Sequence, residues 1–183
     1  MPAVGRRTEK GHRMKYFGTD GFRGRANEGL NVEHAYKIGR YVGWYYGARQ
    51  GKKARVILGK DTRRSSYMFE SAIVSGLVAS GADAYMLHVI PTPGVSYEVV
   101  DGAFDCGVMI TASHNPYTDN GIKLVNREGY KMDEDVLELI EEYIDGKSEV
   151  HRATISAPRS TTCRAATATS PASSRAAGSL SRA

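Results

Sequence analysis

The feature that most constrains this chain is an apolar run, Cys106–Ile110, that stops at a turn of small and polar residues. A short continuous apolar run of this kind is typical of a strand buried on both faces of a sheet. The turn that follows reads Thr-Ala-Ser-His-Asn-Pro over residues 111–116, and its Asn-Pro pair favours a loop. Because open α/β sheets bind ligands at the carboxyl ends of their strands, Ser113 stands at a position typical of a functional residue.

Short β-type runs alternate with helical patterns along the rest of the chain. Strands are expected over residues 55–58, 84–90, 106–110 and 122–125. The last is followed by a turn and by a returning strand over residues 130–132. Helices are expected from a cap at Asn31 through the forties, from a cap at Ser65 or Ser66 to about residue 81, over 95–100, and from Asp133 or Glu134 to residue 144. This alternation predicts an α/β fold in layers, with the polar loops gathered at one edge of the sheet.

Two further polar loops carry groups that suit phosphate. Residues 18–24 are rich in glycine and include Arg23; glycines let backbone N–H groups approach an oxyanion, and arginine adds a bidentate partner. The loop after the expected strand 55–58 contains Asp61 and Arg63. Spacing alone leaves other interpretations open: an ordinary turn with a surface arginine, and a local ion pair between Asp61 and Arg63. His88 lies in an apolar run, where a core histidine is commoner than a ligand.

Four ordered segments resemble the α-D-phosphohexomutase family, whose phosphoserine loop is similar to residues 111–116. The other three are FGTDGFRG over residues 17–24, GKDTRRSS over residues 59–66 and NGIK over residues 120–123. Within that family the wording most resembles the bacterial phosphoglucosamine mutases. The resemblance covers roughly residues 14–150.

The resemblance implies the first domain of the phosphohexomutase fold, which is a three-layer α/β/α domain with a mixed sheet. It also implies an intramolecular phosphotransferase that moves phosphate between O6 and O1 of a hexose or hexosamine phosphate, here glucosamine 6-phosphate to glucosamine 1-phosphate. In that family a phosphoserine gives its phosphoryl group to the sugar phosphate, and the bisphosphate reorients and returns the other group. A sugar bisphosphate therefore serves as activator.

The matched positions imply a role for each candidate residue. Ser113 is the phosphoserine, Lys123 the general acid–base group, His114 a histidine that assists it, and Arg23 a cation near the transferring group. The resemblance places Thr19, Arg63 and Asn115 at the substrate or its phosphate. A phosphoserine carries nearly two negative charges, so its transfer depends on neighbouring cations and on a positioned proton acceptor. For Lys123 a strand-edge lysine that discourages aggregation is the competing interpretation.

The family implies Mg²⁺ held by the phosphoserine and by aspartates of an Asp-Gly-Asp-type loop in a second domain. This sequence has no such loop after Asn120, so Ser113, through its phosphate, is the one metal ligand that can be assigned. Matches to the sugar-recognition loop of the third domain and the phosphate-clamping loop of the fourth are also missing. We therefore expect an incomplete magnesium site and little or no turnover from this chain alone.

The tail differs in composition from the rest of the chain. We expect residues 1–13 to be an unstructured extension, residues 14–150 to form the domain, and residues 151–183 to be disordered. From residue 152 onward the only larger apolar side chains are Ile155, Cys163 and Leu180, which cannot build a core. We interpret the tail as an out-of-frame reading of a longer gene; a natural disordered basic tail is the alternative.

Charge and hydropathy exclude several classes of function. The formal net charge of +5 is matched by five tail arginines, Arg152, Arg159, Arg164, Arg175 and Arg182, so bulk charge is no argument for nucleic acid. No apolar run approaches a membrane span, and the N-terminus lacks the apolar core of a signal peptide. We expect a cytoplasmic protein that binds a hexose or hexosamine phosphate, without nucleic acid or membrane. A sugar-phosphate-binding module without turnover is the second hypothesis, and a nucleic-acid-associated protein that uses the tail is the third.

Overall fold

The computed structural model describes residues 14–150 and the two-residue strand Arg164–Ala165. The elements follow in the order β1 (Phe17–Gly18), β2 (Gly21–Arg25), α1 (Val32–Gln50), β3 (Arg55–Lys60), α2 (Arg64–Ala79), β4 (Asp83–Val89), α3 (Thr92–Asp101), β5 (Cys106–Ile110), β6 (Asp119–Val125), α4 (Glu134–Ile144) and β7 (Arg164–Ala165). The predictions for residues 1–13 and for the tail lie outside the described residues, apart from β7. None of the helices in the described ranges is long and apolar enough to cross a membrane.

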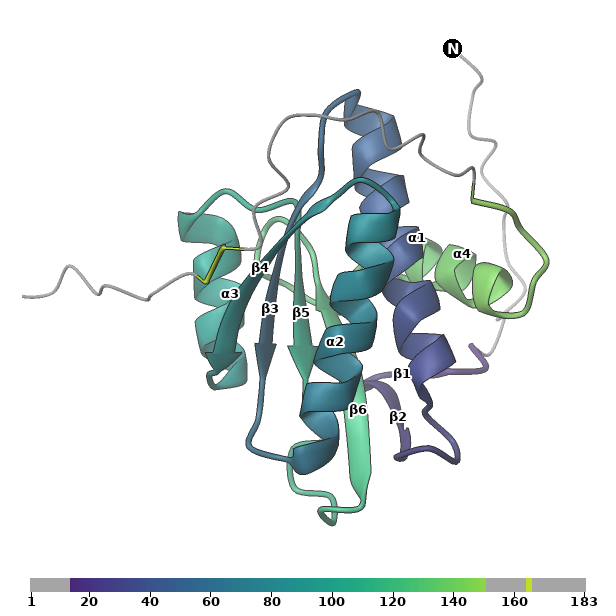
Figure 1. Cartoon of the computed structure of the whole chain (residues 1–183), viewed down its shortest axis with the longest axis vertical. Helices are drawn as coiled ribbons and strands as arrows, with labels where there is room; N and C mark the ends of the chain where they lie inside the picture. The colour runs from purple at the N-terminus through teal and green to yellow at the C-terminus, as the bar shows by residue number, and fades with distance from the viewer. Residues whose placement is uncertain (1–13, 151–163, 166–183) are drawn as a thin grey trace, which may run out of the picture.

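One mixed sheet forms the middle of the domain. Its strand order is β1-β2-β6-β5-β3-β4-β7. Strand β3 pairs in parallel with β4 and β5, whereas β6 is antiparallel to both β5 and β2. The loops that follow β3 and β5 meet at one end of the sheet, at the bottom of Figure 1. The parallel strands β3 and β5 therefore deliver their polar loops to the same place.

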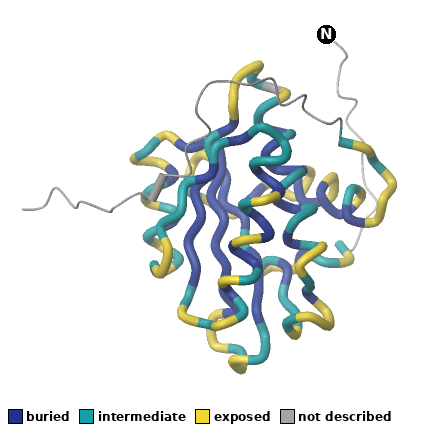
Figure 2. Tube along the Cα trace, in the orientation of Figure 1, coloured by how far each residue is buried: buried dark blue, intermediate teal, exposed yellow. Residues whose placement is uncertain are grey.

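Helices cover both faces of the sheet, as Figure 1 shows. Helices α1, α2 and α4 lie on one face and bury a large apolar core that includes Ile38 and Phe69. Helix α3 lies on the other face, where Val95 and Met109 belong to a smaller core. The strands between them run as buried segments in Figure 2. The predicted three-layer α/β/α architecture with a mixed sheet is confirmed.

Helices α1 and α4 begin where their capping residues predict. The Asn31 side chain accepts the His34 N–H at 2.9 Å, and His34 accepts the Asn31 N–H in return. The expected apolar stripe of α1 is buried: Ala35, Ile38, Val42 and Tyr45. Helix α4 follows an N-cap at Asp133 and ends at the C-cap Asp145.

The start of α2 differs from the prediction. Its N-cap is Arg63, and neither Ser65 nor Ser66 caps the helix. Both serine hydroxyls instead accept hydrogen bonds from Asn120 Nδ2, at 2.8 and 3.0 Å. The two serine hydroxyls therefore bond to a residue 55 and 54 positions away along the chain and do not cap the helix.

Three other local predictions are wrong. Helix α3 begins at Thr92, ahead of the predicted residue 95, because Pro93 falls in the first turn, where a missing N–H costs no hydrogen bond. His88 is exposed with a φ of +58°, beside an irregularity in the β3–β4 pairing that turns it out of the core. Residues 130–132 form no strand; they contribute an isolated bridge between Val125 and Lys131.

Candidate functional site

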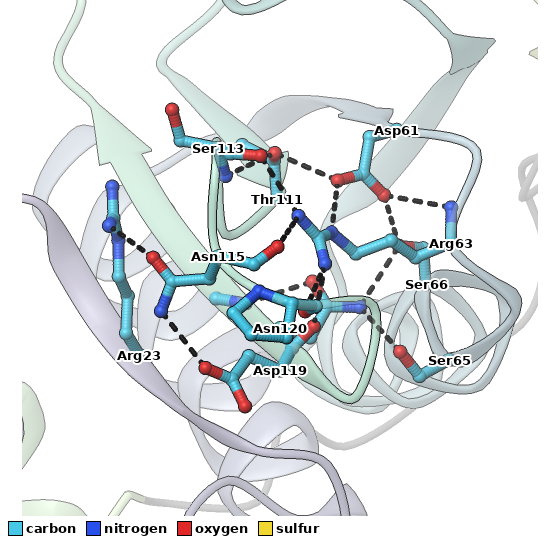
Figure 3. A network of polar contacts seen from close by, with 12 residues as sticks. Arg23, Asp61, Arg63, Ser65, Ser66, Thr111, Ser113, Asn115, Asp119 and Asn120 are labelled. Carbon is cyan, nitrogen blue, oxygen red and sulfur yellow. Dashed lines mark hydrogen bonds and ion pairs between the residues drawn. The ribbon is translucent and has the colours of Figure 1, made fainter.

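Ser113 lies in the loop between β5 and β6, at the carboxyl end of a fully buried strand. Its φ is +57°, a left-handed conformation that is uncommon outside glycine. The Thr111 hydroxyl accepts the Ser113 N–H at 3.0 Å and donates to the Asp61 carboxylate at 2.9 Å. In Figure 3 the Ser113 hydroxyl points away from this network. The fold therefore holds the serine backbone in a strained conformation and leaves its hydroxyl exposed.

Arg63 lies against the loop, and its guanidinium donates mainly to backbone carbonyl groups (Figure 3). Its acceptors are the carbonyl oxygens of Ser113 (2.9 Å), Asn115 (2.9 Å), Pro116 (2.6 Å) and Asp119 (3.2 Å), and the Asp61 carboxylate (2.8 Å). A guanidinium carries five N–H donors, so this set of acceptors matches all of them. The phosphate contact that the sequence predicts for Arg63 has no free donor in this arrangement.

Asp61 joins the end of β3 to the loop and to α2. It accepts hydrogen bonds from the Arg63 N–H at 3.0 Å, from Ser66 Oγ at 2.8 Å and from Thr111 Oγ1 at 2.9 Å. Partial burial raises the pKa of the Asp61 carboxyl, but these bonds and the Arg63 ion pair together outweigh it and hold the pKa below its ordinary value. The ion pair between Asp61 and Arg63 that spacing left open is confirmed.

Arg23 reaches the same loop from β2. Its Nη1 donates to Asn115 Oδ1 at 3.1 Å, and its Nη2 lies 3.2 Å from the Asp20 carboxylate. The Nε of Arg23 is buried and has no hydrogen-bond partner among the described residues. Arg23 therefore brings a positive charge to the side of the loop that is remote from Arg63.

Lys123 shares a face of the sheet with Arg23. Arg23 is opposite Gly121 in the β2–β6 pairing, and Lys123 follows Gly121 by two residues. Alternate residues of a strand point to the same face, so both cations lie on one side of β6. Lys123 lines a cavity of about 180 Å³ whose lining includes Thr19 and Asp20.

The remaining predicted residues lie at different distances from this network. His114 follows Ser113 directly and is exposed. Thr19 lines the same cavity as Lys123. A groove of about 720 Å³ runs along the side of the loop that Arg63 contacts, and its lining includes Ser113, Arg63 and Tyr117. Ser113 therefore opens onto free space on the surface of the described domain.

Sequence reasoning assigned no role to several residues that build the loop. Asn120 is fully buried, and its Oδ1 accepts the Gly121 N–H at 2.8 Å while its Nδ2 binds the two serines of α2. Asp119 accepts from Asn115 Nδ2 at 3.0 Å. The available signal for Asn120 was its place in the matched segment NGIK, directly before the glycine.

The side chains of residues 14–150 do not make a complete magnesium site. Within this range no group of three or more His, Cys, Asp or Glu side chains is arranged to hold a metal ion. The two acidic residues of the network, Asp61 and Asp119, already accept hydrogen bonds from the loop and α2. A phosphate on Ser113 would add oxygen ligands from one position alone, so the other ligands of a magnesium ion would have to come from outside residues 14–150.

A family model and two similar relatives point to the same family of proteins. Residues 14–151 match the family model described as phosphoglucomutase/phosphomannomutase, alpha/beta/alpha domain I. The chain is 66% identical over 133 residues to a phosphoglucosamine mutase of Lachnoclostridium phytofermentans, which covers 73% of this chain and 29% of that protein. It is 63% identical over 134 residues to the phosphoglucosamine mutase of Lachnospira eligens, covering 73% and 30%. The chain therefore spans about three-tenths of the length of these relatives.

Solved structures resemble the described domain as well. A phosphoglucomutase/phosphomannomutase family protein from Burkholderia thailandensis aligns with a TM-score of 0.63 at 27% identity, over 75% of this chain and 31% of that one. The phosphoglucomutase parafusin from Paramecium aligns with a TM-score of 0.62 at 22% identity, over 70% and 25%. The second likeness shows the fold alone.

Proposed function

The chain belongs to the phosphoglucomutase/phosphomannomutase family through its α/β/α domain I, and we propose that it supplies the phosphoserine part of a phosphoglucosamine mutase. The reaction is an isomerisation that moves phosphate between O6 and O1 of a hexosamine phosphate. The observation that carries this proposal is the exposed Ser113 at the end of β5, held at a φ of +57° with Arg23 at the edge of its loop. A sugar-phosphate substrate also suits a cytoplasmic location.

Ser113 is the residue that carries the phosphoryl group. In the loading step its Oγ attacks a phosphorus of a sugar bisphosphate, the Oγ–P bond forms and the sugar O–P bond breaks. The hydroxyl proton of Ser113 leaves, and the departing sugar oxygen gains a proton. Transfer to the substrate is the reverse of this step at the other sugar oxygen, so a bisphosphate is both activator and intermediate.

Lys123 is the proposed group that exchanges protons with the sugar oxygen. It lies on the same face of β6 as Arg23 and lines the cavity that Thr19 also lines, which supports its role as the positioned acid–base group. His114 is next to Ser113 and exposed, which supports the proposal that it assists at the same oxygen. These roles predict that a Lys123→Met variant takes up phosphate on Ser113 far more slowly than the wild-type chain does.

The polar neighbours of Ser113 have supporting roles in this proposal. Arg23 offsets negative charge on the phosphoryl group, and its bond to Asn115 holds the guanidinium at the loop. Thr19, in the cavity beside Lys123, contacts the sugar phosphate. Magnesium would neutralise charge on the transferring group, with one ligand from the phosphate on Ser113 and the others from outside residues 14–150. We therefore propose that the chain accepts a phosphoryl group without sustained turnover.

A second candidate function is sugar-phosphate binding without chemistry. The incomplete donor set for magnesium in residues 14–150 favours it, because charge neutralisation by a metal is part of most phosphoryl transfers. This candidate predicts magnesium-independent affinity for glucosamine 6-phosphate and an unmodified Ser113. Titration calorimetry in the presence of a chelator measures that affinity directly.

Incubation with sugar bisphosphates tests the proposal. The purified chain is mixed with glucosamine 1,6-bisphosphate and Mg²⁺, and the position of the phosphate is mapped in a peptide digest. We expect phosphate on Ser113, none on a Ser113→Ala variant, and slower uptake from glucose or mannose 1,6-bisphosphate. A chain that binds the bisphosphate and remains unmodified would favour the binding module.

A further inference from the structure

We propose that Arg63 is a positioning residue for Ser113, which acts on the backbone of the loop and makes no contact with the phosphate. The role in catalysis rests on the proposed phosphoryl transfer to Ser113. The structural part, that Arg63 fixes the conformation of the loop, stands independently of that transfer. It replaces the phosphate contact that the sequence predicted for Arg63.

The first argument is the match between donors and acceptors. Four backbone carbonyl oxygens, those of residues 113, 115, 116 and 119, converge on one guanidinium. Without Arg63 these carbonyl groups lose a charged donor that no other described side chain of the network supplies. A lysine cannot replace it, because its single nitrogen has three donors and lacks the planar fork that reaches five acceptors.

The second argument concerns the two backbone groups of Ser113. Its N–H donates to Thr111 Oγ1, and its carbonyl oxygen accepts from Arg63. Thr111 and Arg63 are both bonded to the Asp61 carboxylate. One carboxylate therefore fixes both ends of the serine residue through two intermediates. This arrangement determines the direction of the Cα–Cβ bond and hence the position of the nucleophilic oxygen.

The third argument is the strain that this arrangement overcomes. A φ of +57° is unfavourable for serine, so the free loop would prefer another conformation. Residues keep such conformations where the surrounding structure overdetermines them, often at sites of function. The Arg63 side chain is 11% exposed and is held by Asp61 at 2.8 Å, so it forms a rigid support for the loop. The Ser113 hydroxyl points away from that support (Figure 3).

The experiment separates the effect of the planar guanidinium fork of Arg63 from the effect of its positive charge. Arg63→Lys keeps the positive charge and removes the fork, and Arg63→Gln removes both. The exposed Arg127, in the turn after β6, is changed to Lys and to Gln as the matched control. For each full-length variant we measure the rate of Ser113 phosphorylation by glucosamine 1,6-bisphosphate, its dependence on bisphosphate concentration, and amide hydrogen exchange over residues 111–121. Thermal unfolding confirms that each variant is folded.

A positioning role predicts that both Arg63 variants lose rate at saturating bisphosphate by about a hundredfold, the loss expected when a reacting group is misplaced by about 1 Å. The bisphosphate concentration that gives half the maximal rate stays unchanged. The backbone amides of residues 111–121 exchange at least about tenfold faster than in the wild-type chain, whereas those of β5 exchange at the wild-type rate. The Arg127 variants resemble the wild-type chain in rate and exchange.

Other results would overturn the inference. If Arg63→Lys keeps its rate and its loop exchange, or loses affinity for bisphosphate at an unchanged maximal rate, Arg63 acts through its charge on the phosphate. If the wild-type chain takes up no phosphate, the proposed function fails, and loop exchange alone decides whether Arg63 fixes the loop. A variant that does not fold is replaced by the other substitution in both measurements.

Discussion

Arg23 of β2 lies directly opposite Gly121 of β6, and the lack of a side chain on Gly121 leaves room for the arginine stem. A Cβ atom at this position would lie 3.1 Å from Arg23 Cγ and 2.6 Å from the carbonyl oxygen of Thr111. The glycine thus lets β2 and the end of β5 approach β6 closely. Because Arg23 also binds Asn115, the spacing at Gly121 determines where the positive charge meets the Ser113 loop.

Gly121→Ala is predicted to destabilise the domain. The added methyl group has to move backbone or displace Arg23, and overpacking of this kind costs about 1–3 kcal/mol. Gly47→Ala in α1 is the control, because a Cβ there meets its nearest atom at an ordinary 3.5 Å and alanine favours a helix. Denaturant unfolding should show a loss for the first variant and a small gain for the second; equal stabilities would contradict the close approach.

Replacement of Ser113 should reveal the strain in its backbone. Glycine adopts a φ of +57° without the steric cost that alanine pays there. Ser113→Gly is therefore predicted to be more stable than Ser113→Ala by about 1 kcal/mol. Both variants lack the hydroxyl, so the comparison isolates the backbone. An alanine variant as stable as the glycine variant would indicate that the loop is not held in this conformation.

Asp61 should contribute stability that disappears in acid. Burial raises the pKa of its carboxyl, but the hydrogen bonds from Arg63, Ser66 and Thr111 lower the pKa by more than burial raises it. The pKa of Asp61 in the folded protein is therefore below its unfolded value. A carboxyl of this kind stabilises the fold above its unfolded pKa of about 3.9, and that stability is lost as the pH falls through the folded pKa. The gap in unfolding free energy between wild type and Asp61→Asn should therefore narrow below about pH 4.

The unfolding free energy of Asp101→Asn, measured over the same range of pH, is the control. Asp101 is exposed at the end of α3, away from the Ser113 loop. A gap for Asp61→Asn that stays constant down to the lowest pH would show that its carboxylate gains nothing from the network.

The buried ion pair of Lys60 and Glu70 joins β3 to α2, and its contribution to stability can be tested. Their side chains are 1% and 8% exposed and form an ion pair, with the Lys60 ammonium 3.5 Å from the centre of the Tyr67 ring. Lys60→Met leaves a buried carboxylate without its cation, which costs about 3 kcal/mol or more. Combining it with Glu70→Leu should restore most of that loss, because two apolar side chains replace the pair.

The exposed pair of Lys53 and Asp83 is the matched control for this double-mutant cycle. Lys53→Met should change stability by less than about 1 kcal/mol, since solvent screens the interaction. If Lys60→Met costs no more than Lys53→Met, Lys60 is not buried against Glu70 as the structure shows.

The elements whose signals are local were predictable from the sequence. Burial repeats with the helical period in α1 and α4, and Asn31 caps α1 because its partner, the His34 N–H, lies within the first turn. The cap of α2 was not predictable, because Asn120 takes the hydroxyls of Ser65 and Ser66 across 55 and 54 residues. Sequence spacing contains no information on a partner that the fold brings from another strand.

The candidate site shows the same division. The ordered motifs predicted that Ser113, Arg23 and Arg63 would meet, and the structure brings Arg23 and Arg63 to opposite sides of one loop. Which acceptors Arg63 uses depends on how the loop closes, and four of the five are backbone carbonyl groups that every sequence possesses. The presence of an arginine in the sequence therefore predicts bonds to oxygen atoms, but the fold determines which residues supply those atoms.

The most direct test of the phosphoserine account follows both products of one incubation. Glucosamine 1,6-bisphosphate is mixed with the chain and Mg²⁺, and the monophosphates released are counted together with the phosphate on Ser113. We predict a burst of a single equivalent of monophosphate per chain, matched by phosphorylated Ser113, and then no further conversion of glucosamine 6-phosphate. Release without phosphate on Ser113, no release at all, or continued interconversion of the two monophosphates would contradict the account.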